Sequence, residues 1–163
     1  MSNKQTGNMS GRNFEILVEE AINKKTGYSS VLNSTNPSLT NTLIREYPYR
    51  TMYGSMGRLD FRLNLNGKTY YIECKYQGSA GSVDEKLVYT LYNMEQHRDG
   101  IKIIVIDGDG WRKTTLGWIY EASEKTDTKV MNLAGFKNFM EKITKFDDGE
   151  VQEEIDGSLE KFL

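Results

Sequence analysis

The chain has 163 residues, which suits one domain with a substantial hydrophobic core. Its single cysteine excludes an intramolecular disulfide and a cysteine-based zinc site, and its single histidine argues against a metal site built from several histidines. The formal net charge of −2 is uneven, since residues 146–163 carry seven acidic side chains and one basic side chain, or −6, which leaves +4 for residues 1–145.

The first predicted element is a helix over residues 12–26, which Gly27 ends. Its apolar residues recur at the spacing of one helix face, and they are Phe14, Leu17, Val18, Ala21 and Ile22. Glu15 and Glu19 share one face of this helix, while Glu20 lies about a third of a turn away. Residues 27–57 lack clear periodicity, and we expect them to be part strand and part loop.

Residues 58–75 have the pattern of a β-hairpin with Asn66-Gly67 as its two-residue turn. The turn fixes the cross-strand pairs of the apolar face, which are Leu65 with Lys68, Leu63 with Tyr70, Phe61 with Ile72 and Leu59 with Cys74. The opposite face places Asp60 across from Glu73, with Lys75 one step further along. Two carboxylates and an amine therefore converge.

Facing carboxylates destabilise a sheet unless a cation lies beside them. A hard divalent metal such as Mg²⁺ would compensate Asp60 and Glu73, because it prefers one or two carboxylates together with water and phosphate oxygens. The alternative is a hairpin whose outer face is simply solvated, as one face of an antiparallel sheet usually is. Cys74 lies on the core face, and we interpret it as a packing residue and not as a nucleophile.

A loop of small residues follows the hairpin and leads into a helix that runs to about His97. Ser82 can cap this helix, and Glu85 completes a capping box. We interpret His97 as a favourable charge at the helix C-terminus and not as a catalyst.

The apolar run at residues 101–107 suits a strand buried on both faces. We expect a helix at 111–125, an edge strand at 129–133 and a helix at 134–145. A hairpin, a helix and then a buried strand predict an α/β core.

The acidic segment at the end of the chain keeps apolar residues at helical spacing, namely Val151, Ile155, Leu159 and Phe162. It could form an amphipathic helix that docks on the core or on a partner subunit, or its charge could serve solubility alone. We therefore divide the chain into a domain of residues 1–145 and an amphipathic tail of residues 146–163.

Asp60 followed across the hairpin by Glu73-Cys74-Lys75 resembles the active-site motif of the PD-(D/E)XK nuclease superfamily, with Leu59 where the family has proline. The resemblance implies a restriction-endonuclease-like α/β core, a mixed central sheet flanked by helices in the order αβββαβ. It also implies that Asp60 and Glu73, with the Cys74 carbonyl, ligate one or two Mg²⁺ ions, for which Mn²⁺ can substitute. Lys75 would position or activate the attacking water and stabilise developing charge.

The resemblance suggests further site residues. Gln77, two residues past Lys75, could orient water or the scissile phosphate, and Glu19 or Glu20 could supply an additional metal contact. We expect DNA contacts from three residues near the site, which are Arg58, Ser82 and Lys86. Part of residues 27–57 could form another DNA-contacting loop. The alternative for the loop after the hairpin is a flexible polar surface, and the helix glutamates could simply face solvent.

The resemblance implies a Mg²⁺-dependent endonuclease that hydrolyses phosphodiester bonds of double-stranded DNA to 5′-phosphate and 3′-hydroxyl ends. We expect a site-specific enzyme of the homing or restriction type. Because both strands must be cut, we expect a homodimer or a higher symmetric oligomer.

Three alternatives remain. A Holliday-junction resolvase or another structure-specific nuclease would have the same motif, and a non-catalytic DNA-binding protein could keep the fold. A sugar or nucleotide enzyme could use the same carboxylates, but the sequence has no recognisable nucleotide loop. The polar N-terminus and the lack of a long apolar run predict no secretory signal and no membrane partner, and the single cysteine fits a reducing cytoplasm. The resemblance implies a bacterial or phage-infected host cell as the setting.

Overall fold

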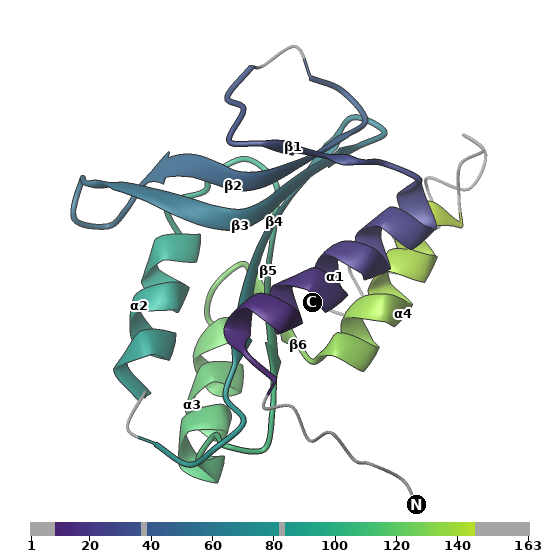
Figure 1. Cartoon of the computed structure of the whole chain (residues 1–163). Coiled ribbons are helices and arrows are strands. Elements are labelled where there is room, and N and C mark those ends of the chain that lie inside the picture. The colour runs from purple at the N-terminus through teal and green to yellow at the C-terminus, as the bar shows by residue number, and fades with distance from the viewer. Residues whose placement is uncertain (1–8, 37–38, 82–83, 146–163) are drawn as a thin grey trace, which may run out of the picture.

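The computed structural model describes residues 9–36, 39–81 and 84–145. The helices and strands follow one another along the chain in this order: α1 Gly11–Thr26, β1 Ser30–Leu32, β2 Thr42–Arg50, β3 Met56–Leu65, β4 Lys68–Tyr76, α2 Asp84–Met94, β5 Ile101–Asp107, α3 Lys113–Glu124, β6 Thr128–Met131 and α4 Leu133–Thr144 (Figure 1). The predicted αβββαβ order is confirmed, with α1, β2, β3, β4, α2 and β5 in these places. No helix in these described ranges is long and apolar enough to cross a membrane.

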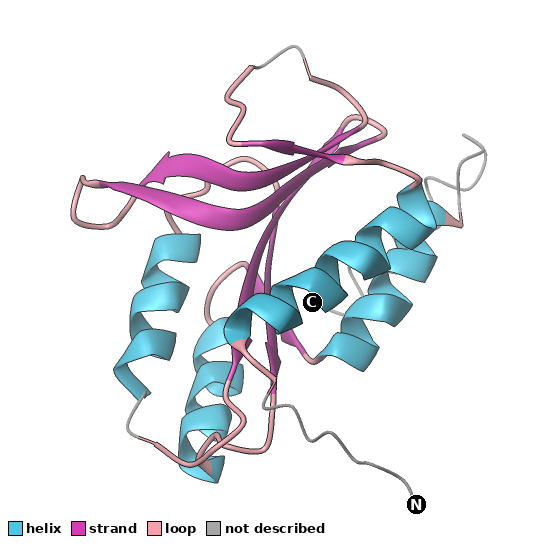
Figure 2. Ribbon diagram, viewed as in Figure 1, coloured by secondary structure: helices cyan, strands magenta, loops and turns pink. Residues whose placement is uncertain are grey.

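The six strands form one mixed sheet in the order β1-β2-β3-β4-β5-β6. The pairs β2 with β3 and β3 with β4 are antiparallel, and the other neighbours are parallel. Helices α1 and α4 pack on one face of the sheet, while α2 and α3 pack on the other (Figure 2). The expected α/β fold is therefore confirmed.

Helix α1 starts one residue before its predicted start, because Ser10 caps it by accepting a hydrogen bond from the Asn13 N–H at 3.1 Å. Gly27 ends the helix in the left-handed conformation, with φ of 73°. The stripe Phe14, Val18 and Ile22 is buried against the sheet. The caps thus set the bounds of α1, and the sequence periodicity sets its buried face.

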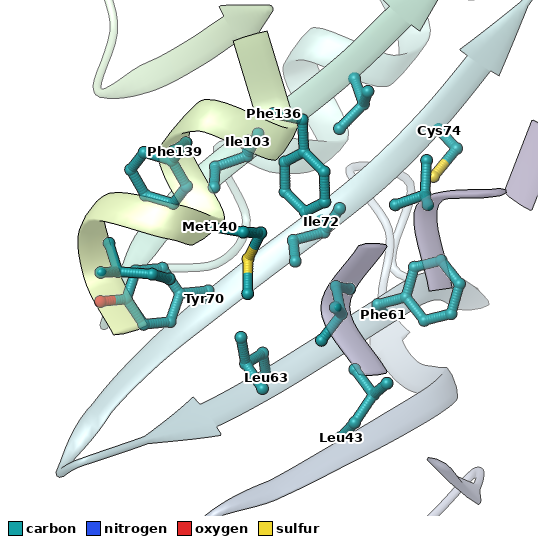
Figure 3. Packing of buried hydrophobic residues seen from close by; sticks show 14 of the residues in the cluster. Leu43, Phe61, Leu63, Tyr70, Ile72, Cys74, Ile103, Phe136, Phe139 and Met140 are labelled. Carbon is teal, nitrogen blue, oxygen red and sulfur yellow. The ribbon is translucent and has the colours of Figure 1, made fainter. Parts of the chain in front are cut away.

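The hairpin has the predicted register from Leu65 with Lys68 as far as Phe61 with Ile72. Asn66 and Gly67 both have positive φ, 50° and 79°, as a type I′ turn requires. One face of the hairpin forms a core cluster with α1 and α4, and the labelled members include Phe61, Leu63, Tyr70, Ile72, Cys74, Phe136 and Met140 (Figure 3). The predicted packing role of Cys74 is confirmed by its burial in this cluster.

Leu59 departs from the predicted register. We expected it on the same face as Phe61, but it lies in the second core cluster with Tyr71 and Leu87, on the α2 side of the sheet. Glu46, across from Asp60, has a positive φ of 53°, and the faces of β2 and β3 exchange sides at this point. The prediction is wrong because strict alternation holds only while each strand keeps its regular pleat.

Strand β2 is longer than the weak periodicity of residues 27–57 suggested. It pairs with β3 from Thr42 opposite Asn64 to Arg50 opposite Met56, and it contains Pro48. Proline has no backbone N–H to donate, so it is tolerated on the edge of a strand that has no neighbouring strand. The pairing of β1 with β2 covers residues 43–45, so Pro48 lies beyond β1.

His97 is not the helix charge that we expected. Helix α2 ends at Met94, and His97 is buried between the rings of Tyr49 and Tyr71, with ring centroids 4.6 and 4.4 Å away. Burial, with Lys102 and Arg62 adding to its effect, lowers the pKa of His97 to about 4. The ring is therefore neutral at pH 7, and it packs as an aromatic residue.

The second half of the domain follows its prediction closely. Strand β5 contributes Ile103 and Val105 to one core cluster and Ile104 and Ile106 to the other, so it is buried on both faces. Helices α3 and α4 and edge strand β6 differ from their predicted bounds by two residues or fewer. The predicted cap at Ser82 and the predicted tail lie outside the described residues.

Candidate active site

Strands β3 and β4 separate beyond the pair Phe61 with Ile72, and two acidic side chains fill the fork between them. The Asp60 N–H donates a hydrogen bond to Oε2 of Glu73 at 3.2 Å. The Cys74 N–H donates to Oδ2 of Asp60 at 2.8 Å. Each carboxylate is therefore oriented by a backbone N–H of the opposite strand.

Lys75 is the cation of this fork. Its Nζ lies 3.4 Å from Oε1 of Glu73. Burial disfavours the charged lysine, but the carboxylates of Glu73 and Asp60 outweigh it and raise the pKa of Lys75 above its usual value. Lys75 is therefore protonated at neutral pH. The structure brings Asp60, Glu73 and Lys75 together as the hairpin register predicts.

The two carboxylates carry more negative charge than one lysine balances. Burial, and next the charge of Glu73, raise the pKa of Asp60 to about 8. Burial also raises the pKa of Glu73, although Lys75 opposes this. Such a closely spaced pair titrates as a unit. It retains a proton near neutral pH unless another cation arrives.

Glu15 is a third acidic residue at the fork, and the sequence interpretation did not select it. Burial, and next the carboxylate of Asp60, raise the pKa of Glu15 to about 7, and a side-chain hydrogen bond to Asp60 contributes. Arg12, one turn earlier on α1, lies 3.5 Å away from Glu15 and lowers that pKa. The sequence signal that could have identified Glu15 is its place directly after Phe14, in the first turns of a helix with an apolar stripe.

Glu19, in contrast, does not reach the fork. It accepts a hydrogen bond from the Ser30 hydroxyl at 2.7 Å and lies 4.0 Å from Arg45. Glu20 is exposed. Of the helix glutamates, Glu15 is therefore the one beside Asp60, one turn earlier on the face shared with Glu19, which was named with Glu20 as the expected metal contact.

Tyr49 approaches the fork from the opposite side of the sheet. Burial, and next the charge of Glu73, raise the pKa of its phenol above the usual value. Its ring also contacts His97, on the α2 side. Glu15 lies on the α1 side, so the carboxylates of the fork have an ionisable neighbour on each face of the sheet.

Gln77 lies where β4 leaves the sheet. Its Nε2 donates to the Ser79 carbonyl at 2.7 Å, so the side chain is folded into its own loop. Its backbone is held between β5 and the following turn, since its N–H donates to the Asp107 carbonyl at 3.2 Å and its carbonyl accepts from the Gly110 N–H at 2.8 Å. A Cβ on Gly108 or Gly110 would collide with this loop, at Gln77 and Ser79 respectively.

Two of the three expected DNA-contacting residues lie within the described part of the chain. Arg58, two residues before Asp60, has a side chain that is 65% exposed and lies 3.4 Å from Glu46. Lys86 is exposed in the first turn of α2. Ser82 lies outside the described residues.

The fork fits a hard divalent cation. Carboxylate and carbonyl oxygens are the donors that Mg²⁺ prefers, usually with several waters. The N–H and C=O of one strand residue face the same neighbouring strand, so the Cys74 carbonyl faces the fork together with its N–H. Within the described ranges, no group of three or more His, Cys, Asp or Glu residues surrounds one point as a complete metal cage. A cation here would therefore rely on Asp60, Glu73 and water or phosphate oxygens.

The chain matches a known protein family over most of its length. A family model described as the PD-(D/E)XK nuclease superfamily domain matches residues 6–145 of the chain. A comparison with curated proteins gives no match. The matched segment contains the fork, helices α1 and α4 on one face of the sheet, and helices α2 and α3 on the other face.

Proposed function

The chain belongs to the PD-(D/E)XK nuclease superfamily, and on this premise we propose that it is a metal-dependent, site-specific endonuclease of double-stranded DNA. The observation that carries the proposal is the fork, where Asp60 and Glu73 share hydrogen bonds across two strands and Lys75 lies 3.4 Å from Glu73. Family membership supports a nuclease, and the unbalanced negative charge of the fork supports a divalent cation.

Asp60 and Glu73, with the Cys74 carbonyl, would hold this cation. When bound, Mg²⁺ supplies a Lewis acid for the phosphoryl oxygen and lowers the pKa of its bound water. The two hydrogen bonds from backbone N–H groups keep the carboxylate oxygens in place. The position of Glu15 beside Asp60 supports a further role in holding water or the cation.

Lys75 would act as a charged donor. Because its pKa is raised, it keeps its proton at neutral pH, and it would position the attacking water and stabilise the negative charge that develops on the phosphate. The bond that breaks is the one to the 3′ oxygen, so the products would carry 5′-phosphate and 3′-hydroxyl ends. Mn²⁺ would substitute for Mg²⁺, since both accept oxygen ligands.

The activity test uses the full chain with three substrates: genomic DNA, supercoiled plasmid and a four-way junction, each in Mg²⁺ or in EDTA. Discrete fragments that need Mg²⁺ and disappear with Glu73→Ala would support a site-specific endonuclease. Cleavage of the junction alone would replace that proposal with a resolvase. DNA binding without cleavage in Mg²⁺ or Mn²⁺ would overturn the enzymatic proposal in favour of a binding protein.

A further inference from the structure

Beyond the fork, β2 and β3 continue as a two-stranded arm formed by residues 47–59, which extends over α2 (Figure 1). The pairing of β1 with β2 covers residues 43–45, and the pairing of β3 with β4 ends at Phe61. The arm is therefore a β-ribbon that continues past its neighbouring strands.

One face of the arm is fixed to the domain. Tyr49 and Leu59 pack into the core cluster that contains α2. The turn of the arm is also attached, because the Met52 N–H donates to Oδ1 of Asn93 at 3.0 Å. Tyr53 in the same turn stacks on a ring of α2 with centroids 5.9 Å apart. The arm is therefore held in place on its inner face and at its tip.

The other face of the arm is open and leads directly to the fork. Register pairs Pro48 with Arg58 and Arg50 with Met56, so these four side chains share one face. Met56 is 64% exposed and Arg58 is 65% exposed. Asp60 follows Arg58 by two residues on the same strand, where β3 enters the fork. A ligand whose reacting group lies at Asp60 can therefore extend along this face.

The two arginines on this face, Arg50 and Arg58, are in settings that leave them available to phosphate. Nη1 of Arg50 donates to the Gly54 carbonyl at 3.0 Å, which keeps the guanidinium over the turn. Arg58 forms an exposed ion pair with Glu46, and exposed pairs of this kind are weak. A guanidinium has five donors in a fixed plane, which suits two-point contact with phosphate oxygens.

We propose that the outer face of this arm binds the DNA duplex beside the scissile phosphate, with Arg50 and Arg58 on backbone phosphates and Met56 between them at the groove. This inference rests on the proposed function. A two-stranded ribbon is of a size that the major groove admits. A second copy of the chain fits this face poorly, because a two-fold contact would bring arginines against arginines. The arm would thus hold the duplex in register next to the fork, from within the same domain.

The test measures binding of the full chain to a duplex of about 30 base pairs in EDTA, over a series of salt concentrations. Each phosphate contact contributes about 1 to the slope of log affinity against log salt, so Arg50→Ala with Arg58→Ala should lower the slope by about 2. Lys137→Ala is the matched control, since Lys137 is exposed on α4, away from the arm, and its slope should equal that of the wild type. Arg58→Gln alone, with an expected change of about 1, replaces the double variant if that variant loses cooperative melting.

The outcomes separate the two proposals. An unchanged slope in the arm variants, with a wild type that binds and cuts DNA, would overturn the arm and leave the nuclease intact. A wild type that neither binds nor cuts any DNA would overturn both. A lowered slope in the arm variants and not in Lys137→Ala would support the arm.

Discussion

Asp60 sets how the protein responds to pH. Its pKa rises from 3.8 to about 8 on folding, so in this range the native state holds more protons than the unfolded state. The contribution of Asp60 to the free energy of unfolding is thus fully present below the pKa of the unfolded chain. It is lost as the pH rises through the pKa of the folded state. Glu15 acts in the same direction, with a pKa of about 7. His97 acts in the opposite direction because its pKa is lowered. The stability linked to His97 is lost as the pH falls from 6.5 to about 4.

We therefore expect that, in EDTA, urea unfolds the wild type more easily at about pH 8.5 than at about pH 6.5. Asp60→Asn should reduce this difference and should stabilise the metal-free protein at the higher pH by at least about 1 kcal/mol. Mg²⁺ should stabilise the wild type by binding to the native state, and it should have less effect on Asp60→Asn. Equal unfolding midpoints at the two pH values would contradict this account of the fork.

Glu15 and Glu19 make a matched pair one turn apart on the same helix. Glu15 contacts Asp60, whereas Glu19 contacts Ser30 and Arg45. We expect Glu15→Gln to lower single-turnover cleavage by roughly 10- to 100-fold, the usual effect of removing a partner of a ligand, and Glu19→Gln to leave it within about twofold. A larger effect of Glu19→Gln would restore the original expectation for that residue.

The sequence alone does not decide which of these glutamates lies beside Asp60. Helical spacing shows that Glu15 and Glu19 share a face, but the packing of α1 on the sheet decides which turn meets Asp60. The hairpin register from Leu65 to Phe61 could be predicted because Asn66-Gly67 encodes it locally, and Asp60 meets Glu73 directly beyond its last pair.

Among the elements, the turn after β5 holds the loop that carries Gln77. A Cβ at Gly110 would collide with the Ser79 backbone, and no heavy atom lies within 4 Å of a Cβ at Gly117 in α3. We expect Gly110→Ala to destabilise the protein by about 1 to 3 kcal/mol through this clash. Gly117→Ala should stabilise it by up to about 1 kcal/mol, because glycine disfavours a helix interior. Urea unfolding of both variants checks this, and equal effects would contradict it.

Element boundaries were predictable where local signals mark them. Ser10 and Gly27 delimit α1, and glycines flank β5. Strand β2 was harder to detect, because it contains Pro48 and its faces exchange sides at Glu46. This exchange occurs where β3 diverges from β4, has no local sequence signal, and also places Leu59 in the second core cluster. The aromatic environment of His97 likewise depends on two strands that are distant in sequence.

At the scale of the molecule, cleavage of both DNA strands calls for two active sites, and we propose a symmetric oligomer. A dimer should convert supercoiled plasmid to linear DNA with little nicked intermediate, and its mass in analytical ultracentrifugation should be twice that of the chain. Deletion of residues 146–163 tests the proposed tail: a change in oligomer mass would support docking on a partner subunit. An unchanged mass and stability would support solubility as its role.

We propose that the fork of β3 and β4 is the active site of a nuclease. The most direct measurement is single-turnover cleavage by Lys75→Met, compared with Lys137→Met on the exposed side of α4. We expect Lys75→Met to lower the cleavage rate by at least about 100-fold, because one donor to the developing charge disappears. Its cooperative melting and its DNA binding should be unchanged. Lys137→Met should cut at the wild-type rate. Cleavage by Lys75→Met at that same rate would contradict the account.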